Sequence, residues 1–378
     1  TATAAVSIDS DSNVSNTGTL TVVTGRTLSS TNTQLDIIAA DIVIVGTGVI
    51  TSGAGNMTID RSVDGNIGVG SSVQTMQITD AELDQVTATN LTIGGNNTIV
   101  ANISGITNTS VTGTVTVTAS ASANSDVGAS TDNTFNTLIV NARDRINLNA
   151  NYTTTGNLTL NADTDGTAGN SGDDINFVGA RTLTSAGTLI LTAPTGKLTG
   201  DNTVTLNAVA GITLNDGLTA AGGAVTIDAD TDNNGVGDFT IVAGETLITT
   251  NNTLSITAND IILTGGLDSG AAATTLLVSD GGTIGLGATA GDYTLDGAEL
   301  QRITATGLIL GDANSGDITV NNITAANSNN VSGTVTLNAT RDNATLTFAT
   351  AASTFNAIAA NADDRITVNV DLTTDVGN

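Results

Sequence analysis

A seven-residue segment that recurs along the chain constrains the fold more than any other feature of the sequence. At residues 156–162 it reads Gly-Asn-Leu-Thr-Leu-Asn-Ala. In each copy, apolar residues at the third and fifth positions alternate with Thr, Ser, Ile or Asn, a period of two that is typical of a strand with one buried face. The other copies lie at 113–119, 187–193, 202–208, 223–229, 252–258 and 333–339. Because no helical pattern separates the copies, they predict a stack of similar strands.

A longer repeat contains these segments. Three pairs of segments match at an almost constant offset: 4–28 with 223–247, 86–94 with 303–311, and 135–146 with 355–366. We therefore interpret residues 1–378 as a single continuous β-solenoid with repeat copy A at 1–157, an insert at 158–224 and repeat copy A′ at 225–378. The insert begins as a degenerate copy of the segment that follows it.

Composition and patterning favour a solenoid over an array of antiparallel sandwiches. Aromatic residues make up 2% of the chain and Trp is absent, whereas immunoglobulin-type sandwiches use a buried Trp or a conserved Tyr. In a parallel solenoid like residues stack on like, which accounts for the repeated Val, Thr and Asn positions in coils of roughly 20 to 22 residues. We expect an all-β, elongated parallel β-helix without significant helix. Residues 80–90 come closest to a helical period, and we interpret them as a turn followed by a strand.

The charge balance excludes several classes of partner. The net charge is −27, from 36 acidic against 9 basic residues, so nucleic acid and anionic membrane surfaces are not expected partners. No apolar run approaches the roughly 18 residues of a membrane span, so we expect no direct membrane insertion. A chain without Cys or His and rich in Thr, Asn, Gly and Ala is typical of secreted bacterial surface proteins. We expect an extracellular location on the bacterial cell surface, with any export segments outside this sequence.

The segment 156–200 resembles the central repeats of filamentous haemagglutinin-type adhesins of two-partner secretion, and of giant bacterial surface repeat proteins. The shared pattern is Gly-small-Leu-Thr-Leu-x-Ala, followed by an Asp-Ile or Arg-Ile strand and a Gly-x-Leu turn, and it covers nearly all of the chain. This resemblance implies a right-handed parallel β-helix and an adhesive or structural role.

Candidate catalytic groups are few. Without His or Cys, chemistry would rest on carboxylates, Arg or Lys. The basic cluster Arg-Asp-Arg at 143–145 is echoed by Asp-Asp-Arg at 363–365. Some parallel β-helix enzymes cleave acidic polysaccharides with Ca²⁺ and basic residues, so a glycan-binding or polysaccharide-cleaving protein is the alternative function. Alternating charges at a strand entry more often form a salt-bridged turn, and we assign no catalytic or cofactor-binding residue.

Acidic loops suggest one cofactor, Ca²⁺. Carboxylates spaced two apart and followed by glycines resemble loops that gather oxygen ligands at about 2.4 Å from a hard cation. Asp and Asn are also ordinary turn-forming residues, so solvated turns are the alternative. The predicted calcium ligands are Asp228, Asp230, Asp232 and Asp238 in one loop, and Asp163 and Asp165 in another.

These observations favour a non-enzymatic extracellular fibre segment: the shaft of a large surface adhesin, a sheath or a filament. By the repeat offsets, residue 378 corresponds to about residue 158, and that residue to about 225 and about 6. The end of one copy is therefore suited to be followed by the beginning of the next. The expected partners are neighbouring copies, end to end or side by side in a filament or array, together with a host or cell-surface glycan as a further candidate.

Overall fold

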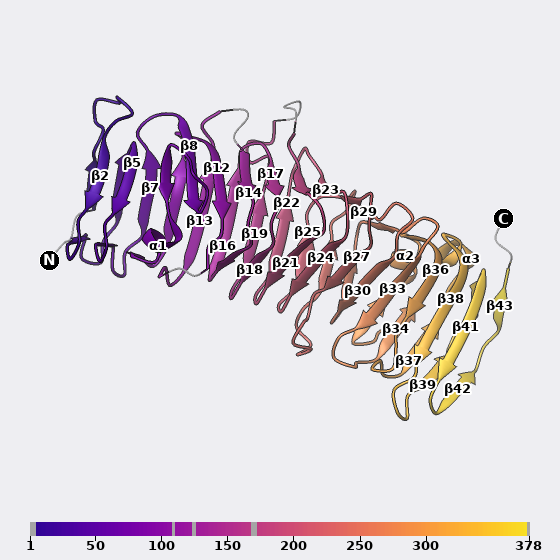
Figure 1. Cartoon of the computed structure of the whole chain (residues 1–378). Coiled ribbons are helices and arrows are strands. Elements are labelled where there is room, and N and C mark those ends of the chain that lie inside the picture. The colour runs from indigo at the N-terminus through magenta and orange to yellow at the C-terminus, as the bar shows by residue number, and fades with distance from the viewer. Residues whose placement is uncertain (1–4, 108–109, 123–125, 168–171, 376–378) are drawn as a thin grey trace. The chain divides into compact units, whose positions relative to one another are not determined.

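The structure is a computed structural model that describes residues 5–107, 110–122, 126–167 and 172–375. In Figure 1 the chain winds in successive coils, and strands pair in parallel with matching strands of neighbouring coils. The helices in the described part of the chain are three single turns: α1 (Asp80–Leu83), α2 (Gly297–Leu300) and α3 (Ala325–Ser328). The predicted all-β parallel β-helix is therefore confirmed.

The chain divides into two compact units. The first comprises Thr1–Gly187 and Leu191–Leu198, and the second comprises Thr188–Ile190 and Thr199–Asn378. Two strands, β22 (Leu189–Thr192) and β23 (Leu198–Gly200), contain residues of both units. The division of the sequence into copy A, insert and copy A′ concerns repeats rather than compact units, and it stays a prediction.

Strands of the first unit follow three sides of the coils. One side carries β1 (Val6–Asp9), β4 (Leu35–Ala39), β7 (Met57–Arg61), β11 (Leu91–Gly95), β13 (Thr114–Ala119), β16 (Thr137–Ala142) and β19 (Leu158–Asn161). A second carries β2 (Thr19–Val22), β5 (Asp41–Ile44), β8 (Gly65–Gly70), β9 (Met76–Ile78), β12 (Thr98–Ser104), β14 (Asp126–Ala129), β17 (Ile146–Leu148) and β20 (Ile175–Phe177). The third carries β3 (Thr27–Ser29), β6 (Val49–Thr51), β10 (Val86–Thr87), β15 (Asn133–Phe135), β18 (Tyr152–Thr154) and β21 (Arg181–Ser185).

The second unit repeats this plan. One side carries β24 (Val204–Ala208), β27 (Val225–Asp228), β30 (Leu254–Ala258), β33 (Ala273–Val278), β36 (Ile303–Leu310), β38 (Val331–Ala339) and β41 (Ala357–Ala362). Another carries β25 (Ile212–Leu214), β28 (Phe239–Ile241), β31 (Ile261–Leu263), β34 (Ile284–Gly287), β35 (Tyr293–Leu295), β37 (Ile318–Asn321), β39 (Thr345–Phe348) and β42 (Arg365–Val368). The remaining strands are β26 (Leu218–Ala220), β29 (Thr246–Ile248), β32 (Gly266–Asp268), β40 (Ser353–Phe355) and β43 (Leu372–Thr374).

Alternating burial along each strand builds the core inside the coils. In β13, Val115, Val117 and Ala119 are buried, and the Thr residues between them lie on the outward face. Val115 lies level with Leu91 of β11 and Leu138 of β16, so apolar side chains stack from coil to coil. Burial of one such side chain contributes about 1.5–3 kcal/mol. A core of uniform layers leaves little irregular space that a large ring would have to fill.

Coil length varies more than the sequence pattern predicts. Leu35 of β4 pairs with Met57 of β7, so this coil is 57 − 35 = 22 residues long. Met57 in turn pairs with Leu91 of β11, so the next coil is 91 − 57 = 34 residues long. The prediction of roughly 20 to 22 residues per coil is therefore wrong for the longer coil. The extra residues of that coil include β9 and α1.

Helices α1 and α2 occupy equivalent places in the two units. Each begins with a capping box, in which Glu82 or Glu299 accepts a hydrogen bond from the backbone of the N-cap residue. The other carboxylate oxygen of Glu82 accepts the N–H of Ile44 at 2.9 Å, and that of Glu299 accepts the N–H of Leu263 at 3.1 Å. These contacts recur at the repeat offset, which is 299 − 82 = 217 for the acceptors and 263 − 44 = 219 for the donors. Residues 80–90 thus form one helical turn followed by the predicted strand, β10.

Candidate functional site

Three turns share one design, and two of them contain four of the predicted cation ligands: Asp163 and Asp165 in one, Asp230 and Asp232 in the other. They follow β1, β19 and β27, and each begins with an Asp side chain that is almost wholly buried. The residue three positions after the Asp has a positive φ and donates its N–H to the Asp carbonyl oxygen. We call these segments the aspartate turns; their Asp residues and turn-closing residues are Asp11 with Val14, Asp163 with Gly166, and Asp230 with Asn233.

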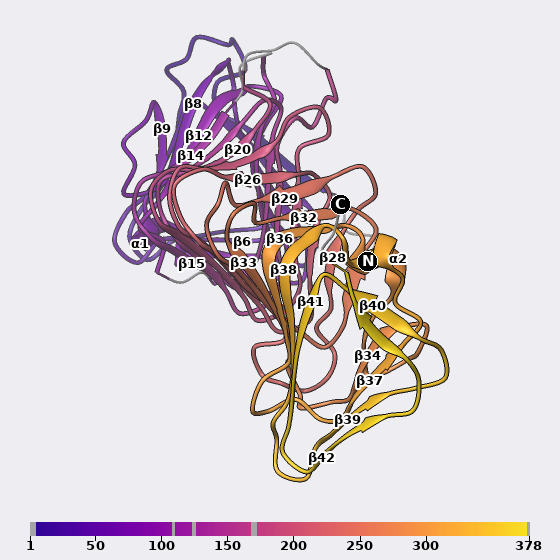
Figure 2. The ribbon, with the colours of Figure 1, turned by 90° about the vertical axis from the view of Figure 1, so that its right-hand side faces the viewer.

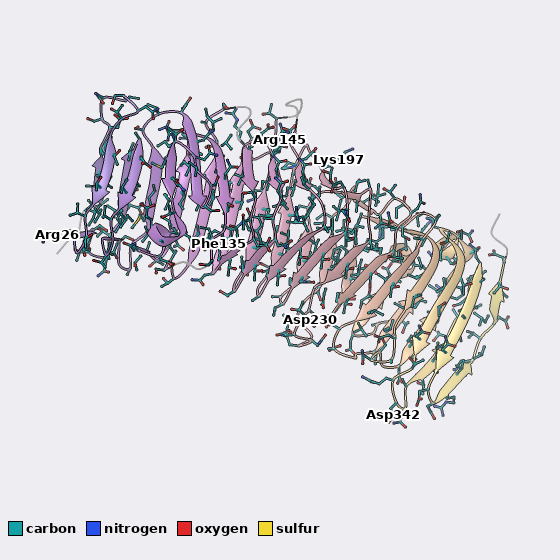
Figure 3. The ribbon with its side chains drawn as sticks, viewed as in Figure 1. Arg26, Phe135, Arg145, Lys197, Asp230 and Asp342 are labelled. Carbon is teal, nitrogen blue, oxygen red and sulfur yellow. The ribbon has the colours of Figure 1, made fainter. Side chains whose placement is uncertain are left out.

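The Asp230 carboxylate is satisfied by the protein itself. It accepts the N–H groups of Asn234 and Gly235 at 3.2 and 3.0 Å, both from its own turn. It also accepts the hydroxyl of Ser279 at 2.6 Å, and Ser279 directly follows β33, two coils further along the chain. The buried carboxylate therefore fixes its own turn and ties it to another coil. Figure 3 labels Asp230 in this turn.

Asp11 makes the equivalent contacts in the first unit. Its carboxylate accepts the N–H groups of Ser15 and Asn16 at 3.1 and 2.8 Å and the hydroxyl of Ser62 at 2.6 Å. Ser62 corresponds to Ser279 at the offset 279 − 62 = 217. Hydrogen bonds from the hydroxyls of Ser15 and Ser62 lower the pKa of Asp11 to about 2, because they stabilise the ionised carboxylate.

Arg61 supports the Asp11 turn and was not singled out by the sequence. It is fully buried, and it donates to the side-chain oxygen of Asn16 at 2.7 Å and to the carbonyl oxygen of Ala40 at 3.2 Å. Burial lowers the pKa of Arg61. The repeat offset places Val278 at the equivalent position of the second unit. The alternation of residues along β7 could have identified Arg61 as a buried residue, because it places Arg61 on the inward face of the strand.

Asp163 makes fewer contacts than the other two. One carboxylate oxygen accepts both the N–H and the hydroxyl of Thr195, at 2.6 and 2.7 Å. The other oxygen, Oδ1, is buried and has no hydrogen-bond partner. Its neighbour Asp165 forms an ion pair with Arg143 at 2.8 Å, and the hydrogen bond from that guanidinium lowers the pKa of Asp165.

The other predicted calcium ligands each have a separate partner. Asp228 accepts the N–H of Asp230 at 3.3 Å, and burial raises the pKa of Asp228. Asp232 accepts the side-chain amide of Asn234 at 2.9 Å, and Asp238 accepts that of Asn259 at 2.9 Å. Within residues 5–107, 110–122, 126–167 and 172–375, no three acidic side chains are grouped so that they could hold a metal ion. Calcium binding therefore stays a prediction from the sequence.

The charged segment 143–145 forms a turn with ion pairs. Arg145 lies 3.2 Å from a carboxylate oxygen of Asp126 and 3.8 Å from Oδ2 of Asp144. Asp144 is fully buried, and both of its carboxylate oxygens lack a hydrogen-bond donor. Burial, followed by the contact with Asp173, raises the pKa of Asp144 to about 7. At 363–365 the turn differs, because Asp363 accepts the N–H of Asn343 at 2.9 Å and Arg365 is exposed.

A polar cavity of about 390 Å³ lies in the second unit beside the Asp230 turn. Its lining includes Asn233, Asp280, Asn314 and Arg341. The Arg341 guanidinium donates to the carbonyl oxygen of Gly281. The cavity thus combines one cation, one carboxylate and two side-chain amides, groups that can bind hydroxyl-rich ligands.

Some inward-facing apolar residues are exposed in β41–β43 (357–374), the last coil that the structure describes. Ile366 is 43% exposed and Val368 is 56% exposed. Their equivalents in β17, Ile146 and Leu148, are 1% and 0% exposed because β20 lies on them. Figure 2 views this end of the second unit, with β41 and β42 on two sides of the coil.

In comparisons with known proteins, no family model, curated protein or solved structure matches the chain. None of the helices in the described ranges is long and apolar enough to span a membrane. Inferences about function therefore rest on the geometry of the chain itself.

Proposed function

We propose that this chain is a non-enzymatic structural segment of an extracellular bacterial fibre, such as an adhesin shaft, sheath or filament, that continues by stacking coil on coil. The resemblance of its repeats to filamentous haemagglutinin-type adhesins agrees with this role. The regular ladder of coils supports it, because each coil offers the next one the same strands and the same apolar layer. The buried carboxylates of Asp11 and Asp230 add ties between coils.

One observation carries the proposal. Apolar residues are buried where the next coil covers them, as Ile146 and Leu148 are beneath β20. Each further coil removes apolar area from water at about 25 cal/mol per Å². It also pairs the backbone groups that a sheet edge leaves unpaired.

Sedimentation velocity over a range of concentrations tests the proposal. We expect the wild-type chain to form species that grow with concentration, and we expect the double variant Ile366→Asp/Val368→Asp to stay monomeric. Ile262→Asp is a matched control, because Ile262 is also 43% exposed but lies on the outward face of β31. A wild-type chain that remains monomeric throughout would overturn the proposal.

A second candidate function, binding of a cell-surface glycan, is favoured by the polar cavity that contains Asp280 and Arg341. Guanidinium and carboxamide groups are suited to the hydroxyls and carboxylates of acidic sugars. Calorimetric titration with a uronic acid oligosaccharide tests this function, with Arg341→Gln as the variant expected to lose binding. No heat of binding to the wild-type chain would exclude acidic glycans as ligands of this cavity.

A further inference from the structure

We propose that the polar cavity beside the Asp230 turn holds one uronic acid unit of a glycan, and that side chains specific to the second repeat copy select this sugar. The sugar carboxylate binds the Arg341 guanidinium, and sugar hydroxyls donate to the Asp280 carboxylate. This inference rests on the second candidate function, glycan binding, and adds to it the sugar unit and the residues that recognise it.

The two units share one framework around the cavity. The hydrogen bond between the aspartate turn and a serine two coils further along occurs in both units. Asn314 of the cavity lining corresponds to Asn97 at the offset 314 − 97 = 217. Three residues before these amides, Gly94 and Gly311 have φ values of 82° and 81°. The two units can therefore be compared at this corner residue by residue.

Three lining side chains differ between the units. In the second unit they are polar or charged, and in the first unit they are apolar. The equivalent pairs are Asn233 and Val14 (233 − 14 = 219), Asp280 and Val63 (280 − 63 = 217), and Arg341 and Ala121 (341 − 121 = 220). The second unit thus carries a cation, a carboxylate and an amide at positions where the first unit has aliphatic side chains.

Two glycines make room for the Arg341 guanidinium. A Cβ atom at Gly281 would lie 2.8 Å from Nη1 of Arg341, and a Cβ atom at Gly316 would lie 2.9 Å from Nη2. The equivalent residues of the first unit are Asp64 and Ile99. The guanidinium also donates to the carbonyl oxygen of Gly281. Among the described residues its other N–H groups have no acceptor, so they remain available to a ligand.

The Asp280 carboxylate is oriented in the same cavity and is not neutralised. Its Oδ1 accepts the N–H of Gly282 at 2.8 Å. Its Oδ2 lies towards Gly235, where a Cβ atom would be 3.1 Å away, and the first unit has Asn16 at that position. Within the part of the chain that the structure describes, Asp280 and Arg341 form no ion pair. Both charges can therefore bind groups of a ligand.

A uronic acid unit has the groups that these side chains require. Its carboxylate matches the paired N–H donors of a guanidinium, and its hydroxyls are donors for a carboxylate. The cavity volume of about 390 Å³ lies at the lower end of the range for ligand sites, roughly 300–1,000 Å³, which suits a small ligand. Because the chain has a net charge of −27, most of its surface repels an acidic glycan. Arg341 supplies the local positive charge that holds the carboxylate.

Calorimetric titration with two matched sugars tests this inference. The first is a trimer of galacturonic acid, and the second is its methyl ester, which keeps the ring hydroxyls and removes the negative charges. We expect the wild-type chain to bind the acid at least about tenfold more tightly than the ester, because a guanidinium–carboxylate pair is a charge-assisted contact. Arg341→Ala introduces the residue of the first unit and should abolish this preference. Arg302→Ala is the matched control, because Arg302 is also exposed and also donates to a backbone carbonyl oxygen, but lies outside the cavity lining.

A second variant tests the hydroxyl contacts. Asp280→Val introduces the first unit's residue, which the equivalent turn accommodates. We expect this variant to bind the methyl ester at least about threefold more weakly, since the ester keeps the hydroxyls that donate to Asp280. Circular dichroism reports whether each variant is folded.

The outcomes separate this inference from the candidate function on which it rests. A wild-type chain that binds neither sugar would overturn both. If the wild-type chain binds the acid but folded Arg341→Ala and Asp280→Val bind both sugars as tightly as the wild type does, glycan binding stands and this cavity is not its site. Equal affinity of the wild-type chain for acid and ester would overturn recognition of the carboxylate.

Discussion

At the scale of single residues, the acidic side chains of the loops were found from the sequence, but their partners were not. The spacing of Asp228, Asp230 and Asp232 indicates a turn rich in oxygen ligands. It does not reveal that Ser279, 49 residues further along, donates to Asp230. The equivalent pair, Asp11 and Ser62, makes the same contact in the first unit. The duplication in the sequence therefore could have indicated that Asp230 and Ser279 are partners. Local spacing alone cannot distinguish a buried hydrogen-bond acceptor from a cation ligand.

Replacement of Asp230 should destabilise its turn. The Asp230 carboxylate accepts three hydrogen bonds. Asp230→Asn replaces one of its two acceptor oxygens with an NH₂ group, which is a donor. We expect a loss of about 2 kcal/mol in the free energy of unfolding, the order measured for hydrogen bonds to charged groups. Urea titration and amide hydrogen exchange at Asn234 and Gly235 provide the measurement. Asp232→Asn is the control, because this exposed side chain in the same turn should change stability by less than about 0.5 kcal/mol.

Calcium addition tests the other interpretation of the same turn. The calcium prediction requires that EDTA lower the melting temperature and that excess Ca²⁺ restore it, because a cation bound only by the folded state stabilises that state by mass action. If the protein donors to the Asp230 oxygens are the only partners of this carboxylate, millimolar Ca²⁺ and EDTA will leave the melting temperature unchanged. A Ca²⁺-dependent increase that is lost in Asp230→Asn would show that the cation-ligand prediction for this loop is correct.

Asp144 should make stability depend on pH. Its pKa is raised from 3.8 to about 7 in the folded chain by burial and by Asp173, so the folded state holds the proton more tightly than the unfolded state. The stabilising contribution is complete below about pH 4 and is lost as the pH rises towards 7. In Asp144→Asn, melting curves should show a weaker fall of stability over this range. The exposed Asp64→Asn should retain the wild-type slope, and an equal slope in all three proteins would contradict the assignment.

At the scale of elements, strands were predictable and coil lengths were not. The alternation that marks β13 or β24 reports directly which side chains face the core. The length of a coil depends on residues outside that alternation, as the insertion containing α1 illustrates. The capping boxes at 79–82 and 296–299 were a local signal for α1 and α2 that the search for longer helices missed. The exposure of β42, in contrast, depends on which coil covers it and cannot be read from its own residues.

Glu299 should stabilise more than its own helical turn. Glu299→Ala removes the capping contact of α2 and the acceptor for the N–H of Leu263. We expect a loss of roughly 1–2 kcal/mol, the size of a helix cap, together with faster amide exchange at Leu263. Glu299→Gln keeps a side-chain oxygen and should lose less. Equal effects of the two substitutions would show that this oxygen is not the stabilising group.

At the scale of the whole molecule, the duplication links sequence, contacts and proposed assembly. Contacts of Asp11, Glu82 and their equivalents recur in the two units, so the repeat preserves specific side-chain interactions as well as strand patterns. The offsets in the sequence indicated the duplication, whereas the side-chain contacts that it preserves were found only in the structure.

Cryo-electron microscopy of the assembled wild-type chain is the most direct test of the central claim, that copies continue one another coil on coil. The account predicts unbranched filaments in which parallel coils continue through each junction at the ordinary strand spacing of about 4.8 Å. Junctions at which the coils of neighbouring copies do not pair, or a chain that stays monomeric at high concentration, would contradict it.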